Sequence, residues 1–285
     1  MPSHSRQTGQ HRSAFSLRFV AVVCVAALVA LALLCSGCAP TSSNSSNTHE
    51  AGSFADGVED SPSSNSNSET AAEDFAPDAD IANNPESNTM ARRSFGTNAA
   101  EVSPMVKAQV EGFLSSDVLC AAKHFPGIGG AEGDSHHESI YSQKTVDQMA
   151  SEELLPFQAA IETNVPFIMV GHLSTPAITG TDAPASLSSE IATGVLRERL
   201  GYEGIVITDS LSMAAASELY PPSKIAVAAL EAGVDMMLMP TDLTVALEGV
   251  VDAVESGTLT EERLDESLMR IVRAKLAWED GSLAA

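Results

Sequence analysis

The chain has 285 residues, a formal net charge of −23 (15 Lys and Arg against 38 Asp and Glu), a hydrophobic fraction of 44% and four cysteines. This length allows one large domain or two small ones with a hydrophobic core. The acidic excess argues against nucleic acid as a ligand, because phosphates would be repelled, and the cysteines are too few for a dense disulfide framework.

The amino-terminal segment has the layout of a secretory signal. Three arginines and no acidic residue precede an unbroken apolar run over residues 19–34, which is short for a bilayer span. The small residues before Cys38 resemble a bacterial lipoprotein signal, although Cys35 stands where leucine is usual. We therefore expect residues 1–38 to be a lipoprotein signal peptide with a lipidated Cys38. A plain transmembrane anchor and a secreted precursor are the alternatives.

A polar segment follows the signal. Residues 39–73 are rich in Ser and Asn, acidic, and nearly free of large apolar side chains. Such a stretch buries too little surface to offset the entropy of ordering it. We expect a disordered tether that holds an extracytoplasmic, lipid-anchored protein on the bacterial cell membrane.

From about residue 75 short apolar runs alternate with stretches of helical periodicity. Near-continuous apolar runs are typical of strands that are buried on both faces, as in parallel sheets. The repeated alternation predicts an α/β fold. The runs cover residues 118–125, 165–172, 204–211 and 234–240, with 75–81 as a weaker candidate.

Helix-end signals support these assignments. Capping hydroxyls favour helix starts and glycine favours helix ends. A closed (β/α)8 barrel and an open doubly wound sheet both fit this pattern. The signals are Thr145 and Thr260 as starts, Ser188 or Ser189 with Gly201, Ser223 with Gly233, and Gly257 as an end.

Polar, reactive residue types follow several different predicted strands, and this distribution favours the barrel. In a (β/α)8 barrel the active site is built from the carboxyl ends of many strands, whereas a doubly wound sheet gathers it near one switch point. The residues concerned are Lys123, His124, His172, Asp209 and the loop of Asp242.

The segment KHFPGIGG, over residues 123–130, is followed by Asp134 and His136. Glycines let the backbone approach a ligand closely, and an aspartate beside a histidine orients the ring and raises its basicity, as acid/base catalysis requires. Polar residues follow the glycines, which disfavours a dinucleotide loop. A zinc site built from residues 136–138 lacks helical spacing. A solvated surface loop is the remaining alternative.

Asp209 emerges at the end of the very apolar segment IVITDSLSM. A carboxylate at such a position is costly unless it has a partner or a function, so it is a candidate catalytic group. A helix cap is the alternative interpretation.

Together these segments resemble a known family. KHFPGIGG…DSHH and IVITDSLSM are similar to the K-H-F-P-G-H-G…D-S-H and S/T-D-D-L-S-M motifs of glycoside hydrolase family 3, in its bacterial β-N-acetylglucosaminidase (β-N-acetylhexosaminidase) branch. FAPDADIANNPESNTMARRSFG resembles the F-A-P-V-x-D-V…N-P…R-S-F-G segment, and MVGHLSTPA and ALEAGVDMMLMP also match in order. The resemblance covers roughly residues 74 to 277.

The resemblance implies retaining hydrolysis of terminal β-linked N-acetylglucosamine, from peptidoglycan fragments or related glycans, through a covalent glycosyl-enzyme. It implies no metal or organic cofactor. Asp209 matches the nucleophile, and His136 with Asp134 the acid/base pair, which departs from the usual two-carboxylate scheme. The residues that match sugar-binding positions are Arg93, Lys123 and His124, and we add His172 as a pocket-lining candidate.

The chain also departs from the family pattern. Ile128 stands where the glycine loop has histidine, and Ser210 replaces the second aspartate after the nucleophile. The tether leads directly into the 75–81 segment, so the first two strands of the barrel and a D-Q-E-G-G sugar-binding motif have no counterpart. We therefore expect residues 74–285 to form a partial barrel. A truncated, non-catalytic surface lipoprotein and a second chain that completes the barrel are the alternatives.

Overall fold

The computed structural model describes residues 72–82, 90, 93–131 and 134–282. The predicted signal peptide, the lipidated Cys38 and nearly all of the predicted tether lie outside these residues. Within them, no helix combines the length and the apolar character needed to cross a bilayer.

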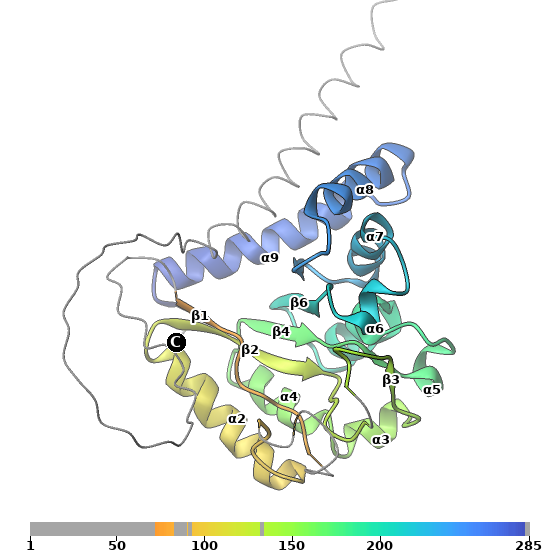
Figure 1. Cartoon of the computed structure of the whole chain (residues 1–285). Coiled ribbons are helices and arrows are strands. Elements are labelled where there is room, and N and C mark those ends of the chain that lie inside the picture. Colours follow the sequence, from red (N-terminus) through yellow and green to blue (C-terminus); the bar gives the residue numbers. More distant parts are fainter. Residues whose placement is uncertain (1–71, 83–89, 91–92, 132–133, 283–285) are drawn as a thin grey trace, which may run out of the picture.

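The described residues form an α/β fold around a five-stranded parallel sheet in which helices connect most successive strands (Figure 1). All four stronger strand predictions are confirmed. The sheet order follows the chain, which is the arrangement of consecutive barrel strands, and β1 and β7 are the edge strands of the described sheet. The strands are β1 (Ala72–Asp74), β2 (Val118–Phe125), β4 (Phe167–Val170), β6 (Ile205–Ser210) and β7 (Met236–Leu238).

The weak strand candidate at residues 75–81 is wrong in its position. The strand β1 begins at Ala72, inside the predicted tether, and ends before the apolar segment starts. The segment still runs beside β2, because Lys123 donates from its backbone N–H to the carbonyl of Pro77 at 3.0 Å, and Ala79 donates back to the Lys123 carbonyl at 2.5 Å. This pairing carries Asp78 and Asp80 along β2 toward its carboxyl end.

Most helices follow the predicted end signals, but Ser223 does not start its helix, because the N-cap is Pro221. Thr145 and Thr260 accept hydrogen bonds from the backbone at helix starts, and Gly233 and Gly257 end helices with positive φ. The elements are α2 (Ala99–Leu114), α3 (Val146–Ala150), α4 (Leu155–Glu162), α5 (Pro176–Thr179), η1 (Ala185–Leu187), η2 (Glu190–Arg199), α6 (Ala214–Ser217), α7 (Pro222–Ala232), α8 (Leu243–Ser256), α9 (Glu261–Glu279), and a small parallel pair of β3 (Ile140–Tyr141) and β5 (Leu173–Ser174).

Alternate residues along the strands face two different layers. Ile168 and Val206 belong to the main core, which also contains Val106 of α2 and Phe157 of α4. Their strand neighbours, such as Phe167, face a second cluster that contains residues of α9. Figure 1 shows the sheet between α9 on one side and α2 and α4 on the other.

A buried carboxylate ties α9 to the amino-terminal end of the sheet. Asp235 lies just before β7 and is 1% exposed. Arg197 of η2 contacts it at 2.5 Å and Arg270 of α9 at 3.1 Å. Ser267 of α9 and the backbone N–H of Val206 donate to it at 2.7 Å and 3.0 Å. This network fixes two helices against two strands at the end of the sheet opposite to the predicted site.

Candidate active site

Two of the predicted site residues meet at the carboxyl ends of β2 and β6, the strands on either side of β4. Asp209 is the penultimate residue of β6, and its side chain is 16% exposed. His124 is the penultimate residue of β2 and lies with its Nε2 atom 3.7 Å from Oδ2 of Asp209. The carboxylate therefore faces solvent on one side and an imidazole on the other.

The orientation of His124 is fixed by Asp80, a residue that sequence reasoning did not single out. The Nδ1 atom of His124 lies 2.7 Å from Oδ2 of Asp80, which is fully buried. Oδ1 of Asp80 accepts a hydrogen bond from the backbone N–H of Ile128 at 2.6 Å. Burial alone would raise the pKa of Asp80, but His124 and these hydrogen bonds outweigh it and lower that pKa. An anionic Asp80 holds the proton on Nδ1 and directs Nε2 toward Asp209.

Arg93 also belongs to this group, whereas Lys123 is placed only by its position in β2. The terminal Nη2 atom of Arg93 lies 3.5 Å from Nε2 of His124, and its Nε atom lies 3.3 Å from Oδ2 of Asp78. Lys123 precedes His124 in β2 and is half-buried. Arg93 thus lies beside His124, which in turn lies beside Asp209.

Among the described residues, this group also contains the one cluster of side chains that could hold a metal ion. Donor atoms of Asp78, Asp80 and His124 lie within 4.8 Å of one another. However, the Nδ1 atom of His124 is already hydrogen-bonded to Asp80, and the Arg93 guanidinium lies against Asp78. A cation beside this guanidinium would be repelled, so the cluster fits a hydrogen-bonded charge network better than a metal site.

The loop after β2 packs tightly under the site. A Cβ atom at Gly129 would lie 2.3 Å from the backbone oxygen of Ile81, so only glycine fits there. Ile128, which stands in place of the family's histidine, is 5% exposed and belongs to the main core. Gly129 therefore allows the close approach of two backbone segments.

His136 and Asp134, the predicted acid/base pair, are in hydrogen-bond contact. The Nδ1 atom of His136 lies 2.7 Å from Oδ1 of Asp134, which also accepts from the His136 backbone N–H at 2.9 Å. Slight burial is outweighed by these hydrogen bonds, so the pKa of Asp134 lies below its ordinary value. The His136 side chain is 55% exposed. The backbone of Ser135 accepts a hydrogen bond from Ala215 N at 3.4 Å, which joins this loop to the helix that follows Asp209.

His172 lies just after the end of β4, where the sequence predicts it. It is 1% exposed, its Nε2 atom donates to the carbonyl of Ser210 at 2.9 Å, and its Nδ1 atom lies 2.8 Å from Oγ of Ser186. Burial lowers the pKa of His172, so the ring is neutral. Both ring nitrogens are bonded within the protein, so His172 supports the end of β6 and the backbone next to Asp209. Its burial argues against the pocket-lining role that the sequence suggests.

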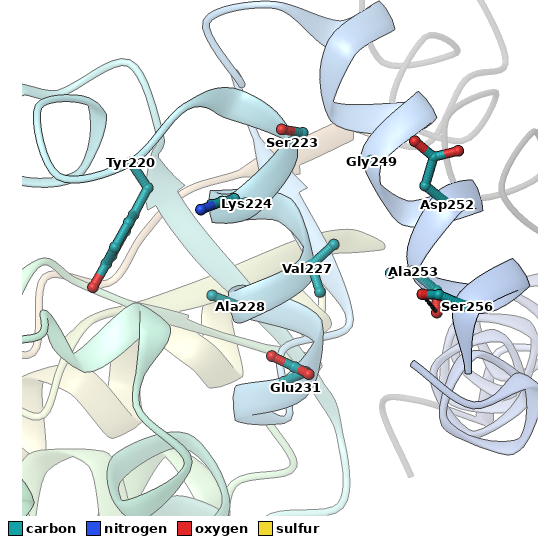
Figure 2. Close-up of a pocket in the computed structure, with 10 residues that line it drawn as sticks. All are labelled: Tyr220, Ser223, Lys224, Val227, Ala228, Glu231, Gly249, Asp252, Ala253 and Ser256. Atoms are coloured by element: carbon teal, nitrogen blue, oxygen red, sulfur yellow. Dashed lines mark hydrogen bonds between the residues drawn. The ribbon is translucent and has the colours of Figure 1, made fainter. Parts of the chain in front are cut away.

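Two further features lie apart from this group. Asp242, after β7, accepts a hydrogen bond from Val245 N at 3.0 Å and caps α8. A groove of about 590 Å³ is lined by residues of α7 and α8, and Figure 2 shows Lys224 and Glu231 on one wall and Asp252 on the other. None of its lining residues belongs to the predicted site.

Comparison with known proteins agrees with this arrangement. The model of the glycosyl hydrolase family 3 N-terminal domain matches residues 65–274. The chain therefore belongs to glycoside hydrolase family 3, and its sheet is a partial barrel of the type found in that family.

Several relatives carry more specific names. The chain is 34% identical to β-hexosaminidase A of Pseudoalteromonas piscicida over 232 residues, which are 74% of this chain and 39% of that one. It is 34% identical to β-hexosaminidase LpqI of Mycobacterium tuberculosis over 210 residues, which are 71% of this chain and 53% of that one. A family 3 β-N-acetylglucosaminidase from Paenibacillus sp. superimposes with a TM-score of 0.70 at 37% identity, covering 75% of this chain and 41% of that structure. The chain thus spans about half or less of the length of these relatives.

Sequence reasoning missed the two acidic residues beside β2. The segment FAPDADI contains two aspartates two residues apart in an otherwise apolar stretch. Buried acidic side chains are rare without a partner, so this spacing was a usable signal. Asp80 and Asp78 are 0% and 7% exposed, and both contact residues of the site.

Proposed function

We propose that this protein takes part in retaining hydrolysis of terminal β-linked N-acetylglucosamine, from peptidoglycan fragments or related glycans. The observation that carries the proposal is the meeting of Asp209, His124 and Arg93 at the carboxyl ends of β6 and β2. The names of the relatives, which are β-hexosaminidases, support the same substrate class.

In the proposed reaction the carboxylate of Asp209 attacks the anomeric carbon. The bond to the leaving-group oxygen breaks as His136, in its imidazolium form, donates its Nε2 proton to that oxygen. This gives a glycosyl ester on Asp209. His136, now neutral, then takes a proton from a water molecule as the water oxygen attacks the anomeric carbon. The bond from this carbon to Asp209 breaks, which restores the carboxylate and the imidazolium and releases the sugar with retained configuration.

The charges around the site suit these roles. Asp134 is anionic and bonded to Nδ1 of His136, so it stabilises the imidazolium form that the first step needs. The cationic Arg93 lies beside His124, and guanidinium N–H groups are strong donors to hydroxyl oxygens. Arg93, Lys123 and His124 would therefore hold the sugar hydroxyls.

Turnover of an aryl β-N-acetylglucosaminide by the full chain, purified after expression in a bacterial host, tests the proposal. We expect release of the chromophore by the unmodified chain and none by Asp209→Ala. Azide should restore release by Asp209→Ala, because a small anion can occupy the space of the lost carboxylate and attack the anomeric carbon.

A matched control replaces an exposed carboxylate far from the site. Asp252→Asn, on α8, changes the net charge as Asp209→Asn does and should leave turnover unchanged. A folded chain that shows no turnover above Asp209→Ala would overturn the proposal and favour a non-catalytic lipoprotein.

We also propose that Cys38 is lipidated and holds the protein on the outer side of the bacterial cell membrane. The proposal rests on the apolar run and small residues that precede this cysteine. Radiolabelled fatty acid should be incorporated into the unmodified chain and not into Cys38→Ala, which should leave the membrane fraction. Labelling that persists in Cys38→Ala would contradict the proposal.

A further inference from the structure

Asp78 is a buried acidic residue for which the proposed reaction has no role. Its Oδ1 atom accepts a hydrogen bond from the backbone N–H of Asp80 at 3.2 Å. Its Oδ2 atom has no hydrogen bond and lies 3.3 Å from Nε of Arg93, so this contact is an ion pair without hydrogen-bond geometry. The F-A-P-V-x-D-V pattern that this segment resembles has valine at this position, which could not make the contact.

The contact falls on the inner edge of the Arg93 guanidinium. Nε faces Asp78, whereas Nη2 faces His124 at 3.5 Å. A guanidinium is planar, and its five N–H groups have fixed directions, so a partner at Nε sets the plane in which the terminal nitrogens lie. The side chain of Arg93 is 39% exposed, so without a partner it has freedom to turn away.

We propose that Asp78 is a positioning residue, whose carboxylate holds Arg93 by its Nε edge and leaves the terminal nitrogens directed at the sugar site. The proposal rests on the proposed function, because it assigns Arg93 to the substrate. Asp78 itself does not touch the substrate.

The charges around Asp78 add a dependence on pH. Its neighbours are Asp80 on its own segment, His124 on β2 and Arg93, with Lys123 next to His124 in the same strand. Burial, and then the negative charge of Asp80, raise the pKa of Asp78 to about 7, against the lowering effects of His124 and Arg93. The ion pair therefore forms fully only above neutral pH.

The expected kinetic signature is a change in KM. Between pH 5 and pH 9 the KM of the unmodified chain for an aryl β-N-acetylglucosaminide should fall by about fivefold as Asp78 ionises and fixes Arg93. Asp78→Asn keeps the size and the acceptor oxygen of the side chain. It should keep a high KM at every pH, with kcat changed by less than about twofold, because Asp209 and His136 are intact.

The variant Arg93→Lys tests whether Asp78 acts on KM through Arg93. Lysine keeps the charge but lacks the planar fork, so Asp78→Asn should add nothing further in the Arg93→Lys background. Asp78→Val, which introduces the residue of the family pattern, repeats the test in case the asparagine variant folds poorly. Additive effects of the Asp78 and Arg93 changes, or a KM profile in either Asp78 variant that equals the unmodified one, would overturn the proposal.

A readout without turnover separates this proposal from the proposed function. The side-chain Nε–H resonance of Arg93, assigned by its loss in Arg93→Lys, should move with pH around neutrality in a nitrogen-15 spectrum. It should be constant in Asp78→Asn. If this resonance titrates but no sugar is hydrolysed, the ion pair stands and the proposed function fails. If it does not titrate in the unmodified chain, the positioning role fails, whatever the turnover.

Discussion

The two ends of the parallel sheet bury carboxylates in opposite ways. At the amino-terminal end, Asp235 is surrounded by Arg197, Arg263 and Arg270, at 2.5, 3.8 and 3.1 Å, and receives further donors from a serine and a backbone N–H. At the carboxyl-terminal end, Asp78 is also buried but keeps one oxygen without a hydrogen bond. The contacts of Asp235 hold helices and strands together. The carboxylate of Asp78 instead keeps an oxygen that faces Arg93 of the candidate site.

This difference agrees with the general behaviour of barrel sheets, whose carboxyl ends carry the active site and whose amino ends serve stability. At the amino-terminal end three guanidinium groups share one carboxylate, and the groups come from η2, the residue before β7, and α9. At the other end Asp209 lies 3.7 Å from His124, and Asp78 lies 3.3 Å from Arg93. Substitutions at the two ends should therefore separate stability from activity.

The largest loss of stability is expected at Asp235. Asp235→Ala leaves three guanidinium groups beside a buried gap, and breaking such a pair costs about 3–5 kcal/mol of unfolding free energy. Urea denaturation followed by circular dichroism measures it. Asp252→Ala removes an exposed carboxylate and should change the same free energy by less than about 0.5 kcal/mol. A loss below about 1 kcal/mol in Asp235→Ala would remove the contrast between the two ends.

His172 lies at the carboxyl end of the sheet, but its replacement should lower stability, as replacement of Asp235 does at the amino end. His172→Leu leaves the Ser210 carbonyl and the Ser186 hydroxyl without their partner, at a cost of about 3 kcal/mol. Turnover per folded molecule should fall as well, because the backbone next to Asp209 loses its support. Thermal unfolding and turnover should therefore change together. A stable variant with normal turnover would show that the ring has no supporting role.

In contrast to the variants above, replacement of Asp78 should raise the free energy of unfolding. Burial and the charge of Asp80 raise its pKa from 3.8 to about 7, so between these values the folded protein holds a proton that the unfolded chain releases. Stability from this group is thus present at low pH and lost as the pH rises through this window. Asp78→Asn lacks this loss and should be more stable than the unmodified chain by about 2 kcal/mol at pH 8.

The pH dependence is the control for that prediction. At pH 4 the two proteins should differ much less, because Asp78 is then protonated in the folded state. A difference in unfolding free energy that is equal at pH 4 and pH 8 would contradict the assignment of the proton to Asp78.

The smallest effect is expected at the start of α9. Thr260 accepts a hydrogen bond from Arg263 N at 3.2 Å, and removing such a cap costs about 1 kcal/mol. Thr260→Ala should lower the midpoint of urea unfolding slightly, with no change in turnover. Thr260→Ser, which keeps the hydroxyl, should restore most of the stability. Loss of turnover in Thr260→Ala would mean that α9 influences the site directly.

Local patterns were sufficient to predict much of the fold. The strand at Val118–Phe125 has the predicted bounds, because an apolar run between a turn and a glycine loop has no competing structure. Helix starts at Thr145 and Thr260 follow from side-chain chemistry within one turn. The helix Ala99–Leu114 escaped prediction, although Asn98 caps it and valines repeat at every fourth position. A proline at position 104 weakens that pattern without breaking the helix.

The site was only partly predictable, for a different physical reason. Motif resemblance indicated Asp209, His124, His136 and Arg93. Sequence could not show that Asp80 and Asp78 lie beside β2, because residues 75–82 reach their place through pairing with a strand about 45 positions later. The burial of His172 likewise depends on Ser186 and Ser210, which belong to other elements.

One pair of variants tests most directly whether activity depends on one end of the sheet and stability on the other. Asp209→Asn and Asp235→Asn each replace one carboxylate of the same sheet by an amide, and both turnover of an aryl β-N-acetylglucosaminide and thermal unfolding are measured. We predict that Asp209→Asn loses at least about 10³-fold in turnover at an unchanged unfolding temperature. Asp235→Asn should unfold at a lower temperature and keep its turnover per folded molecule. An Asp209→Asn variant that retains turnover, or that is destabilised as strongly as Asp235→Asn, would contradict the account.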